Sequence, residues 1–521
     1  MNEETLTLVL GEGERWWGGA VADGQDMPFG ERAHRRDLAT NAGTITDPSA
    51  GPNQSAPLLI SNRGRWVWSD TAFAFSLDAG ALSITGTGLL HGEVGSPAPA
   101  DDASLLRAVF RAASAAHFPP SGRTPAEAMF TGPQYNTWIE MPYRPTQAGV
   151  LDYVKGMLDA GFPPGLVIID DLWSEDYGVW RFDRARFPDP GAMVDQLHAW
   201  GCPVMLWVVP FVSPDSAVFR VLEGRGFLIT GSDGEPIVRR WWNGFSAVLD
   251  TTHPDAVAWL HGELEALQAA HGIDGFKFDA GDLRYHHSDD VTLAHASATE
   301  LCESWARIGL AYPVNEYRAC WRMGGQPLAQ RLHDKPPAWG RDGLGSLIPE
   351  SIAQGLLGLP FNCPDMVGGG ELSAMTEGAL DQELFVRYAQ VAALFPMMQF
   401  STAPWRVLDA QHLSAVLGAV RVRQRLVPVI LDLARQAAIT GEPILRPLAW
   451  SYSGCDHVTD QFLLGDDILV APVLERGAST RRVVLPPGSW VLDDEPTAST
   501  VSGIVDIPVG LSSLPWFRRI R

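Results

Sequence analysis

The sequence predicts an α/β protein in which a (β/α)8 TIM barrel lies between an N-terminal and a C-terminal β-sandwich domain. Two changes of pattern support this fold class. Short runs of alternating apolar and polar residues give way to apolar runs separated by amphipathic helical patterns, and strand patterns return near the end. The chain has 521 residues, enough for about two to four domains. We place the domains at residues 1–122, 123–440 and 441–521.

The N-terminal stretch has the pattern of antiparallel strands. Its runs are separated by Gly, Asn and Pro clusters, and alternation of this kind indicates strands with one buried face. The runs lie at residues 5–10, 65–69 and 73–77. Residues 95–124 contain two bursts of proline around a helical pattern at 104–116, which predicts a linker.

The middle stretch alternates strand and helix patterns. Its apolar runs lie at residues 129–138, 166–169, 203–209 and 275–278. Its helical patterns lie at residues 147–160, 191–200, 254–271 and 410–440. Continuous apolar strands between helices predict a parallel sheet. The pattern alone fits a barrel or an open doubly wound sheet, and a length of about 280 residues favours the barrel.

The last stretch returns to strand patterns, which predict the C-terminal β-sandwich. These runs lie at residues 461–464, 467–472, 482–485 and 489–492, with a Pro-Pro-Gly turn at 486–488.

Composition excludes several classes of protein. The chain carries 39 basic and 61 acidic residues, a net charge of −22, so we expect no nucleic-acid partner. No apolar run approaches the length of a membrane span, and the acidic N-terminus lacks the features of a signal peptide. Five scattered cysteines without CxxC spacing indicate reduced thiols and a cytoplasmic location. The sequence is compatible with a homo-oligomer.

Acidic residues and tryptophans follow several of the predicted barrel strands. Asp170 and Asp171 end one apolar run, Asp279 ends another, and Trp207 lies near the end of a third. A single aspartate in such a place more commonly caps a loop, but parallel strands bring their carboxyl ends to one mouth, where active sites lie. Two carboxyl groups and aromatic platforms are what glycoside hydrolysis needs, so a carbohydrate ligand is expected.

A metal site is not expected. His286 and His287 precede Asp289 and Asp290, but adjacent histidines seldom face one ion, and a solvated loop explains them better. The sequence contains neither a phosphate-binding glycine loop nor a GxSxG motif. We therefore predict that the protein uses no cofactor.

The segment GFKFDAGD at 275–282 resembles the nucleophile signature of glycoside hydrolase family 31. Further blocks follow the order of that family: VIIDDLWSEDYGVWRFDRARFPDP (167–190), MLWVVPFVSPDS (205–216), WWNGFSAVLDTTHP (241–254), WGRDGLGSLIPE (339–350) and LPFNCPDMVGGG (359–370). Residues 439–478 are similar to the start of the family's trailing β-domain. Within the family, the chain most resembles the myogenesis-regulating glycosidase branch and related α-galactosidases.

The resemblance implies roles for the acidic residues at the barrel mouth. Asp279 takes the position of the nucleophile, and Asp342 matches the general acid/base. Lys277, two residues before Asp279, is expected to keep that carboxylate charged and to bond a substrate hydroxyl. The motif before Asp342 reads Gly-Arg where many members have another residue and then Gly.

The resemblance also implies substrate-binding residues. Asp170 aligns with the carboxylate that holds the distal sugar hydroxyls, and Asp171 extends it to a pair like that of related α-galactosidases. Because adjacent strand residues point to opposite faces, we expect one of the two to be structural. Trp207 and Trp339 are expected to form walls of the sugar site.

Arginines and a further aspartate complete the expected site. Arg331 resembles a hydroxyl-binding arginine, with Arg318 and Arg322 as alternatives. Asp365 is expected to orient the site.

These observations favour a retaining exo-α-glycosidase that acts on α-galactosides. The alternatives keep the mechanism and change the sugar to an α-glucoside, an α-xyloside, an α-N-acetylgalactosaminide or a sulfonated sugar. A non-catalytic sugar-binding protein on the same barrel is a third hypothesis, and the presence of both Asp279 and Asp342 argues against it.

Overall fold

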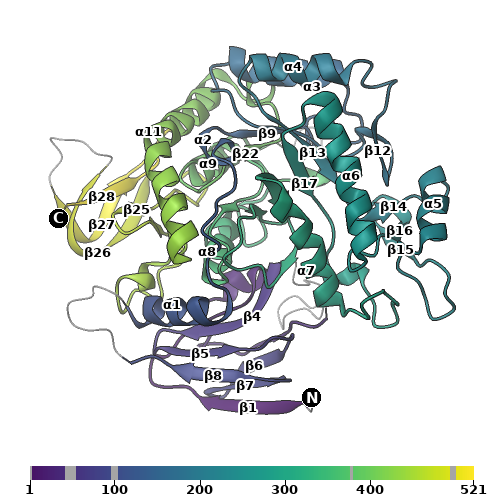
Figure 1. The fold of residues 1–521 in the computed structure, drawn as a ribbon. Coiled ribbons are helices and arrows are strands. Elements are labelled where there is room, and N and C mark those ends of the chain that lie inside the picture. The colour runs from purple at the N-terminus through teal and green to yellow at the C-terminus, as the bar shows by residue number, and fades with distance from the viewer. Residues whose placement is uncertain (1–2, 41–53, 96–103, 376–379, 493–499, 521) are drawn as a thin grey trace.

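The computed structural model describes residues 3–40, 54–95, 104–375, 380–492 and 500–520. A barrel of strands and helices occupies the middle of the molecule (Figure 1). The N-terminal sheets lie at the bottom of that view, in purple, and the C-terminal sheet lies at the left, in yellow. The predicted order of an N-terminal β-rich part, an α/β barrel and a C-terminal β-rich part is therefore the order that the structure shows.

Parallel strands form the wall of the barrel. Their order in the sheet is β21-β20-β18-β17-β13-β10-β9-β22, which is chain order once β22 is placed next to β9. A bridge between Val367 and Phe400 brings the chain beyond β21 against β22, so the sheet nearly closes. The bounds are β9 (Gln134–Asn136), β10 (Val167–Ile169), β13 (Val204–Val208), β17 (Gly275–Phe278), β18 (Val314–Tyr317), β20 (Gln330–Arg331), β21 (Asn362–Cys363) and β22 (Gln399–Phe400).

Helices surround these strands, and several begin and end where the sequence places caps. In α3 the side chain of Thr146 accepts a hydrogen bond from the backbone N–H of Gly149, as an N-cap should. The last turn of α11 ends at Gly441, whose φ of 73° suits glycine. The helices are α3 (Gln147–Asp159), α4 (Pro190–Ala199), α6 (Pro254–His271), α7 (Ala298–Ile308), α8 (Leu347–Leu356), α9 (Gln382–Ala393), α10 (Pro404–Val407) and α11 (Ala410–Thr440).

The first barrel strand is shorter than the sequence predicts. The apolar run at residues 129–138 contains a helical turn, α2 (Ala128–Thr131), before β9 begins at Gln134. Gly132 and Pro133 separate the two elements, and proline cannot donate the backbone hydrogen bond that a longer strand would need.

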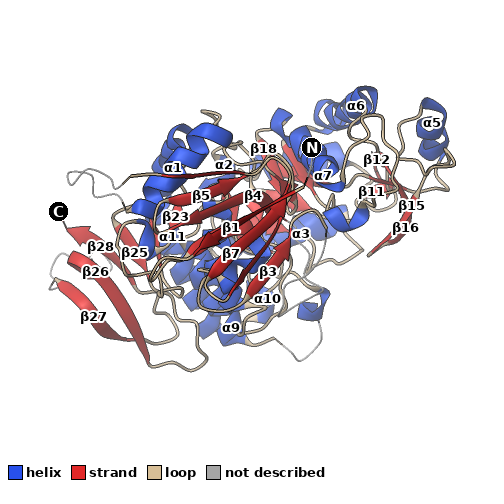
Figure 2. Cartoon of the chain, turned by 90° about the horizontal axis from the view of Figure 1, so that it is seen from below, coloured by secondary structure: helices blue, strands red, loops and turns tan. Residues whose placement is uncertain are grey.

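The N-terminal part consists of two antiparallel sheets that lie nearest the viewer in Figure 2. One sheet has the order β1-β7-β6-β3, and the other contains β2, β4, β5 and β8. The bounds are β1 (Glu4–Val9), β2 (Trp16–Ala20), β3 (His34–Asp37), β4 (Gln54–Ser61), β5 (Arg65–Trp68), β6 (Ala74–Asp78), β7 (Ala81–Gly86) and β8 (Leu90–Glu93). Helix α1 (Leu105–His117) follows them within the predicted linker.

Two elements fasten this part to the barrel. Strand β19 (Cys320–Trp321), from the loop after β18, pairs with β4. The single turn η1 (Val21–Asp26) packs on α8 so closely that a Cβ on Gly24 would lie 2.6 Å from the Cα of Glu350. A glycine is therefore required at this contact, and the N-terminal part forms a continuous interior with the barrel.

The C-terminal part is a six-stranded sheet with the order β23-β24-β25-β28-β26-β27. Its neighbouring strands are antiparallel. The bounds are β23 (Leu445–Arg446), β24 (Phe462–Leu464), β25 (Ile468–Val470), β26 (Thr480–Leu492), β27 (Val501–Pro508) and β28 (Trp516–Ile520).

Two small sheets are inserted at the mouth of the barrel. The hairpin β11 (Ser174–Asp176) and β12 (Val179–Phe182) follows β10. A three-stranded sheet follows β13, with β14 (Phe211–Val212), helix α5 (Ala217–Arg225), β15 (Val238–Trp241) and β16 (Gly244–Val248). The tight turn between β15 and β16 brings Trp242 and Asn243 to the end of this hairpin.

Candidate active site

The carboxyl ends of the barrel strands surround a pocket of about 700 Å³. Acidic, basic and aromatic side chains alternate around it. The residues that line it are Ala22, Trp138, Tyr143, Asp170, Asp171, Trp207, Trp242, Lys277, Asp279, Arg284, Arg318, His333, Asp334, Gly370, Glu371, Leu372 and Ser373. The polar strand ends that the sequence analysis selected thus meet in one cavity.

Asp279 follows the last residue of β17 and is 8% exposed. Its Oδ1 accepts a hydrogen bond of 2.8 Å from Nε of Arg318, and its Oδ2 accepts one of 2.8 Å from Nε1 of Trp207. Burial alone would raise the pKa of Asp279, but the charges of Arg318 and Lys277 and these hydrogen bonds hold it well below its usual range. The carboxylate is therefore ionised and fixed in orientation.

Lys277 lies on β17, two residues before Asp279, and its ammonium group is buried. Its Nζ donates a hydrogen bond of 2.7 Å to Oδ2 of Asp170. The two charges form an ion pair in which neither side chain is more than 4% exposed. Lys277 therefore links the strand that carries Asp279 to the end of β10, which lies two strands away in the barrel sheet.

Asp170 and Asp171 both line the pocket, although adjacent residues of a strand would point to opposite faces. The reason is that β10 ends at Ile169, so the pair lies in the turn beyond the strand. Leu172 then takes a φ of 65°, a left-handed conformation that is costly for a leucine. This turn allows both carboxyl groups to reach the cavity.

Asp171 lies between two polar partners. Tyr177 donates a hydrogen bond of 3.2 Å from its hydroxyl to Oδ1, and the amide of Asn243 donates to Oδ2. Burial and the charge of Asp170 raise the pKa of Asp171 to about 7, against the opposing effect of these hydrogen bonds. Asp171 therefore titrates near neutral pH, unlike Asp279.

Asp334 lies in the same pocket, three residues beyond the end of β20. Its side chain is 36% exposed, and its Oδ1 accepts a hydrogen bond of 2.9 Å from Nη1 of the buried Arg331. Asp279 is thus buried and held by three donors, Arg318, Trp207 and the backbone N–H of Ala280, and Asp334 is open to the cavity. This pair can act as nucleophile and general acid in an acetal cleavage.

Aromatic rings form much of the remaining wall. The rings of Trp138 and Tyr143 meet edge to face at 5.1 Å, and the indole N–H of Trp138 donates to the carbonyl of Gly370. The Arg318 guanidinium lies 5.3 Å from the centre of the Trp242 ring. Such rings offer apolar faces to the C–H groups of a sugar.

Family models match the two parts of the chain that build and follow this pocket. Residues 128–301 match the model described as the glycosyl hydrolases family 31 TIM-barrel domain, and residues 441–519 match the glycosyl hydrolase family 31 C-terminal domain. The chain belongs to glycoside hydrolase family 31.

Relatives of this family 31 chain differ in their described activities. The myogenesis-regulating glycosidase of Mus musculus is 36% identical over 423 residues, which are 77% of this chain and 58% of that protein. The 1,3-alpha-isomaltosidase of Kribbella flavida is 27% identical over 69% of this chain and 57% of its own length. The chain thus spans less than two thirds of these relatives.

Solved structures share the fold. A dextranase of Flavobacterium johnsoniae, complexed with isomaltotriose, aligns with a TM-score of 0.85 and 17% identity over 99% of this chain and 66% of its own. A sulfoquinovosidase from E. rectale, bound to an aza-sugar inhibitor, aligns with a TM-score of 0.83 and 18% identity over 99% and 82% of the two chains. At these identities the comparison establishes the fold.

The structure does not bring Asp342, predicted to be the acid/base, to the pocket of this family 31 chain. Asp342 is exposed and is not among the lining residues. The neighbouring Arg341 pairs with Asp26 of the N-terminal part. The structure therefore places Asp342 outside the pocket, and Asp334 is the carboxyl group in this region of the chain that lines the cavity.

Trp339, predicted as a wall, also lies outside the pocket lining. Its indole N–H donates a hydrogen bond of 2.7 Å to Asp381, and the guanidinium of Arg476 lies 5.9 Å from the centre of its ring. The ring thus packs against the beginning of α9 and a loop of the C-terminal part.

Arg331 and Asp365 lie behind the pocket wall. Both side chains are buried, and neither lines the cavity. Of the two alternatives to Arg331, Arg318 lines the pocket, whereas Arg322 pairs with Glu303 of α7. Asp365 accepts hydrogen bonds from the backbone N–H groups of Lys335 and Gly370, an arrangement suited to the orienting role expected of it.

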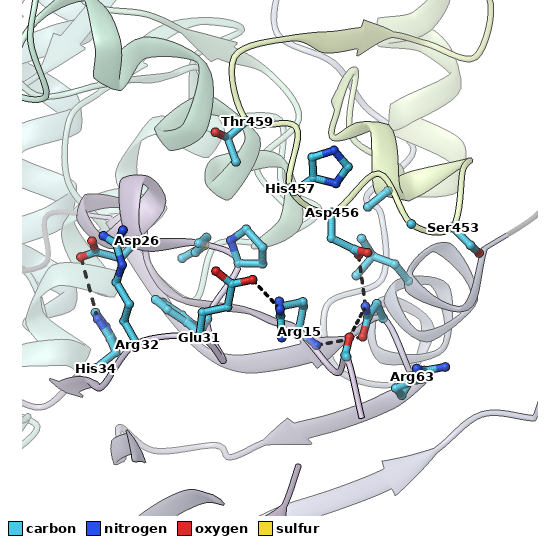
Figure 3. A pocket seen from close by; sticks show the side chains of 18 of the residues that line it. Arg15, Asp26, Glu31, Arg32, His34, Arg63, Ser453, Asp456, His457 and Thr459 are labelled. Atoms are coloured by element: carbon cyan, nitrogen blue, oxygen red, sulfur yellow. Dashed lines mark hydrogen bonds and ion pairs between the residues drawn. The ribbon is translucent and has the colours of Figure 1, made fainter. Parts of the chain in front are cut away.

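A second cavity, of about 850 Å³, lies between loops of the N-terminal and C-terminal parts (Figure 3). It shares no lining residue with the first pocket. Its carboxylates have partners: Glu31 pairs with Arg15, Asp26 with Arg341, and Asp456 accepts from Asn62. This cavity therefore differs from the pocket at the barrel mouth, where Asp170, Asp171, Asp279 and Asp334 line one space.

Other features of the described residues bear on the remaining expectations. No group of three His, Cys, Asp or Glu side chains within the described ranges is arranged to hold a metal ion. None of the five cysteines, all of which are described, forms a disulfide. Among the helices of the described ranges, none combines the length and apolar content needed to cross a bilayer.

Proposed function

We propose that this chain is a retaining exo-α-glycosidase, with α-galactosides as the favoured substrates. The observation that carries the proposal is the pocket in which Asp279 is held ionised while Asp334 remains open to the cavity. Membership of family 31 supports hydrolysis of a glycosidic bond. The relatives are named as glycosidases that act on several different sugars, so the sugar specificity of this chain must be inferred from the residues of its pocket.

In the first step, the proposed acid Asp334 donates its proton to the glycosidic oxygen. The carboxylate of Asp279 attacks the anomeric carbon as the bond to the leaving group breaks, and a covalent glycosyl-enzyme intermediate forms. The hydrogen bonds from Arg318 and Trp207 fix the two oxygens of Asp279 before the attack, which removes much of the entropic cost of alignment.

In the second step, Asp334 acts as a base. It removes a proton from a water molecule that attacks the anomeric carbon from the side that the leaving group has left, and Asp279 departs as a carboxylate. Two inversions at the same carbon retain the α-configuration. Asp279 is a suitable leaving group because its environment stabilises the charged form.

Two neighbouring carboxyl groups at the end of β10 favour a galactoside. Asp170 pairs with Lys277, and Asp171 is held by Tyr177 and Asn243. Two acceptors side by side can bond an axial 4-hydroxyl and its neighbour. A sugar that leaves such a buried group unpaired loses about 1–3 kcal/mol of binding free energy.

The alternatives retain the two-carboxylate chemistry. An α-glucoside, an α-xyloside, an α-N-acetylgalactosaminide or a sulfonated sugar would place a different group beside Asp171. A non-catalytic sugar-binding protein is disfavoured, because such a protein has no need for an ionised buried carboxylate facing a second carboxyl group.

A panel of 4-nitrophenyl α-glycosides tests the function. Hydrolysis of the galactoside with retention, followed by NMR of the first-formed anomer, supports the proposal. Preference for another glycoside keeps the mechanism and replaces the sugar, and absence of hydrolysis with every member contradicts the function. Asp279→Ala should abolish turnover of the preferred substrate while the unfolding midpoint stays close to that of the wild type.

A matched pair of variants tests the acid/base. Asp334→Ala should reduce kcat/KM by about 10²–10⁴-fold on substrates with poor leaving groups, and much less on nitrophenyl glycosides, which need little protonation. Asp342→Ala, on the exposed loop, should behave like the wild type on both. The opposite outcome, with loss only in Asp342→Ala, would return the acid role to that residue.

A cytoplasmic location is part of the proposal on the basis of the sequence, and cell fractionation tests it. We also propose that the chain forms a homo-oligomer. Light scattering on the purified protein tests this, because it gives the mass of the particle directly.

A further inference from the structure

Arg331 is a buried arginine that contacts three carboxyl groups. Its Nη1 lies 2.9 Å from Oδ1 of Asp334 and 2.8 Å from Oδ1 of Asp365, and its Nε lies 3.2 Å from Oε1 of Glu316. The side chain is 1% exposed and does not line the pocket. A direct contact between Arg331 and a sugar hydroxyl therefore has no support in this geometry.

The two buried carboxylates are themselves held from other directions. Oε2 of Glu316 accepts a hydrogen bond of 2.7 Å from the amide of Gln399 on β22. Oδ2 of Asp365 accepts two hydrogen bonds of 2.7 Å from the backbone N–H groups of Lys335 and Gly370. The guanidinium is thus anchored on groups that belong to the barrel wall.

The same anchors fix the backbone around Asp334. Lys335 follows Asp334 directly, and Gly370 begins a segment, residues 370–373, that also lines the pocket. A Cβ on the preceding Gly369 would lie 2.6 Å from the carbonyl oxygen of Lys335, so the two segments meet here without space for a side chain. Arg331 therefore holds the side chain of Asp334, and Asp365 holds the backbone of the next residue, Lys335.

We propose that Arg331 is a positioning residue that holds Oδ1 of Asp334 and leaves Oδ2 to carry the catalytic proton. An oxygen that accepts a guanidinium N–H is a poor site for a proton, so the proton resides on the other oxygen. This inference rests on the proposed function, in which Asp334 is the acid/base.

Charge balance explains how an arginine can serve here. A guanidinium that faced Asp334 alone would favour its charged form and oppose its role as an acid. Arg331 also faces Glu316 and Asp365, which are 1% and 0% exposed, so its single positive charge is shared among three carboxyl groups. It can therefore orient Asp334 without acting as its dedicated counter-ion.

The test compares Arg331→Lys with the control Arg322→Lys. Lysine keeps the charge but lacks the second nitrogen that reaches Glu316, so its ammonium cannot hold Asp334 in the same orientation. Arg322 is the alternative arginine of the same region and pairs with Glu303 outside the pocket. Each variant is assayed on a methyl or disaccharide α-glycoside and on the matching 4-nitrophenyl glycoside.

For Arg331→Lys we expect kcat on the poor leaving group to fall about 100-fold, while kcat on the nitrophenyl substrate falls less than about fivefold and KM changes less than about twofold. The pH profile of kcat/KM on the poor leaving group should also shift, because the acid is no longer fixed. Arg322→Lys should leave both substrates within about twofold of the wild type.

Other results would overturn the inference. A rise in KM with kcat unchanged would indicate hydroxyl binding, and equal losses on both leaving groups would indicate a structural role. The double variant Arg331→Lys with Asp334→Ala gives a second measurement: it should be no slower than Asp334→Ala alone, and additive losses would contradict action through Asp334. If the wild type hydrolyses no α-glycoside, the proposed function itself fails; if the wild type is active and only these comparisons fail, the function stands and the role of Arg331 falls.

Discussion

Replacement of Asp171 by asparagine should raise the free energy of unfolding above that of the wild type at alkaline pH. At acidic pH the two proteins should be equally stable. Burial of the carboxyl group and the charge of the adjacent Asp170 raise the pKa of Asp171 from 3.8 to about 7. In the unfolded chain it loses its proton near pH 4, whereas the folded protein keeps it until about pH 7. Folding therefore becomes less favourable as the pH rises through this interval.

The size of the effect follows from the two pKa values. Over the whole interval the wild type loses about 4 kcal/mol of stability from this one group, and between about pH 5 and about pH 8 it loses about 2.5 kcal/mol. The asparagine side chain keeps an oxygen that can accept from Tyr177 or Asn243 but does not ionise. The variant should match the wild type near pH 5 and exceed its stability by about 2–3 kcal/mol near pH 8.

The measurement is calorimetric unfolding of both proteins at several pH values. For a domain of this size we expect the midpoint of Asp171→Asn to exceed that of the wild type by about 3–5 °C near pH 8 and by about zero near pH 5. Asp152→Asn, on the exposed side of α3, serves as the control for the loss of one charge. A constant difference between Asp171→Asn and the wild type at every pH would show that Asp171 is ionised throughout and would refute the reasoning.

Three further variants test the pocket. Trp207→Phe removes the N–H donor to Oδ2 of Asp279, and kcat should fall about 10–100-fold in steady-state assays; an unchanged kcat would show that this hydrogen bond does not matter for attack. Gly281→Ala should lower the free energy of unfolding by about 3 kcal/mol in denaturant titrations, because its φ is 74° and a Cβ would lie 2.3 Å from the Trp305 ring; a neutral result would contradict that close packing. Ala22→Phe should narrow the pocket and raise KM at least about tenfold at similar stability, and a normal KM would place Ala22 off the path of the substrate.

The parts of the fold with strong local signals could be predicted from the sequence. The helix α11 begins after Asp409, whose side chain caps it, and ends at Gly441, as its apolar periodicity and its end signals indicate. The strand β17 has the predicted bounds because its sequence, GFKF, is mostly apolar and is followed directly by Asp279. The prediction of one strand over residues 129–138 was wrong, because apolar residues alone do not distinguish a helical turn from a strand.

The same distinction explains which site residues could be predicted. Asp170, Asp171 and Asp279 follow recognisable apolar strands, and the rule that strand ends meet at the barrel mouth brought them into one pocket. Asp334 follows β20, which is only two residues long and contains Gln330 and Arg331. Such a strand has no apolar pattern, so the strand-end rule could not be applied to it.

Similarity to the family motif predicted Asp342 as the general acid/base, and this residue lies eight positions after Asp334 in the chain. The intervening residues include two prolines, and the spacing of a motif does not reveal whether the loop between its residues turns away from the site. Packing decides that question: Arg341 and Trp339 find their partners at Asp26 and Asp381. These contacts join segments distant in the sequence and are invisible to local patterns.

The segment η1 gives the pocket at the barrel mouth a wall from outside the barrel. Ala22 reaches the cavity from this segment, while Gly24 beside it presses against the backbone of α8. A truncated protein that starts at the barrel would therefore expose apolar surface and lose one boundary of the pocket. Exchange of this short segment between family members offers a way to reshape the entrance while Asp279 and Asp334 stay in place.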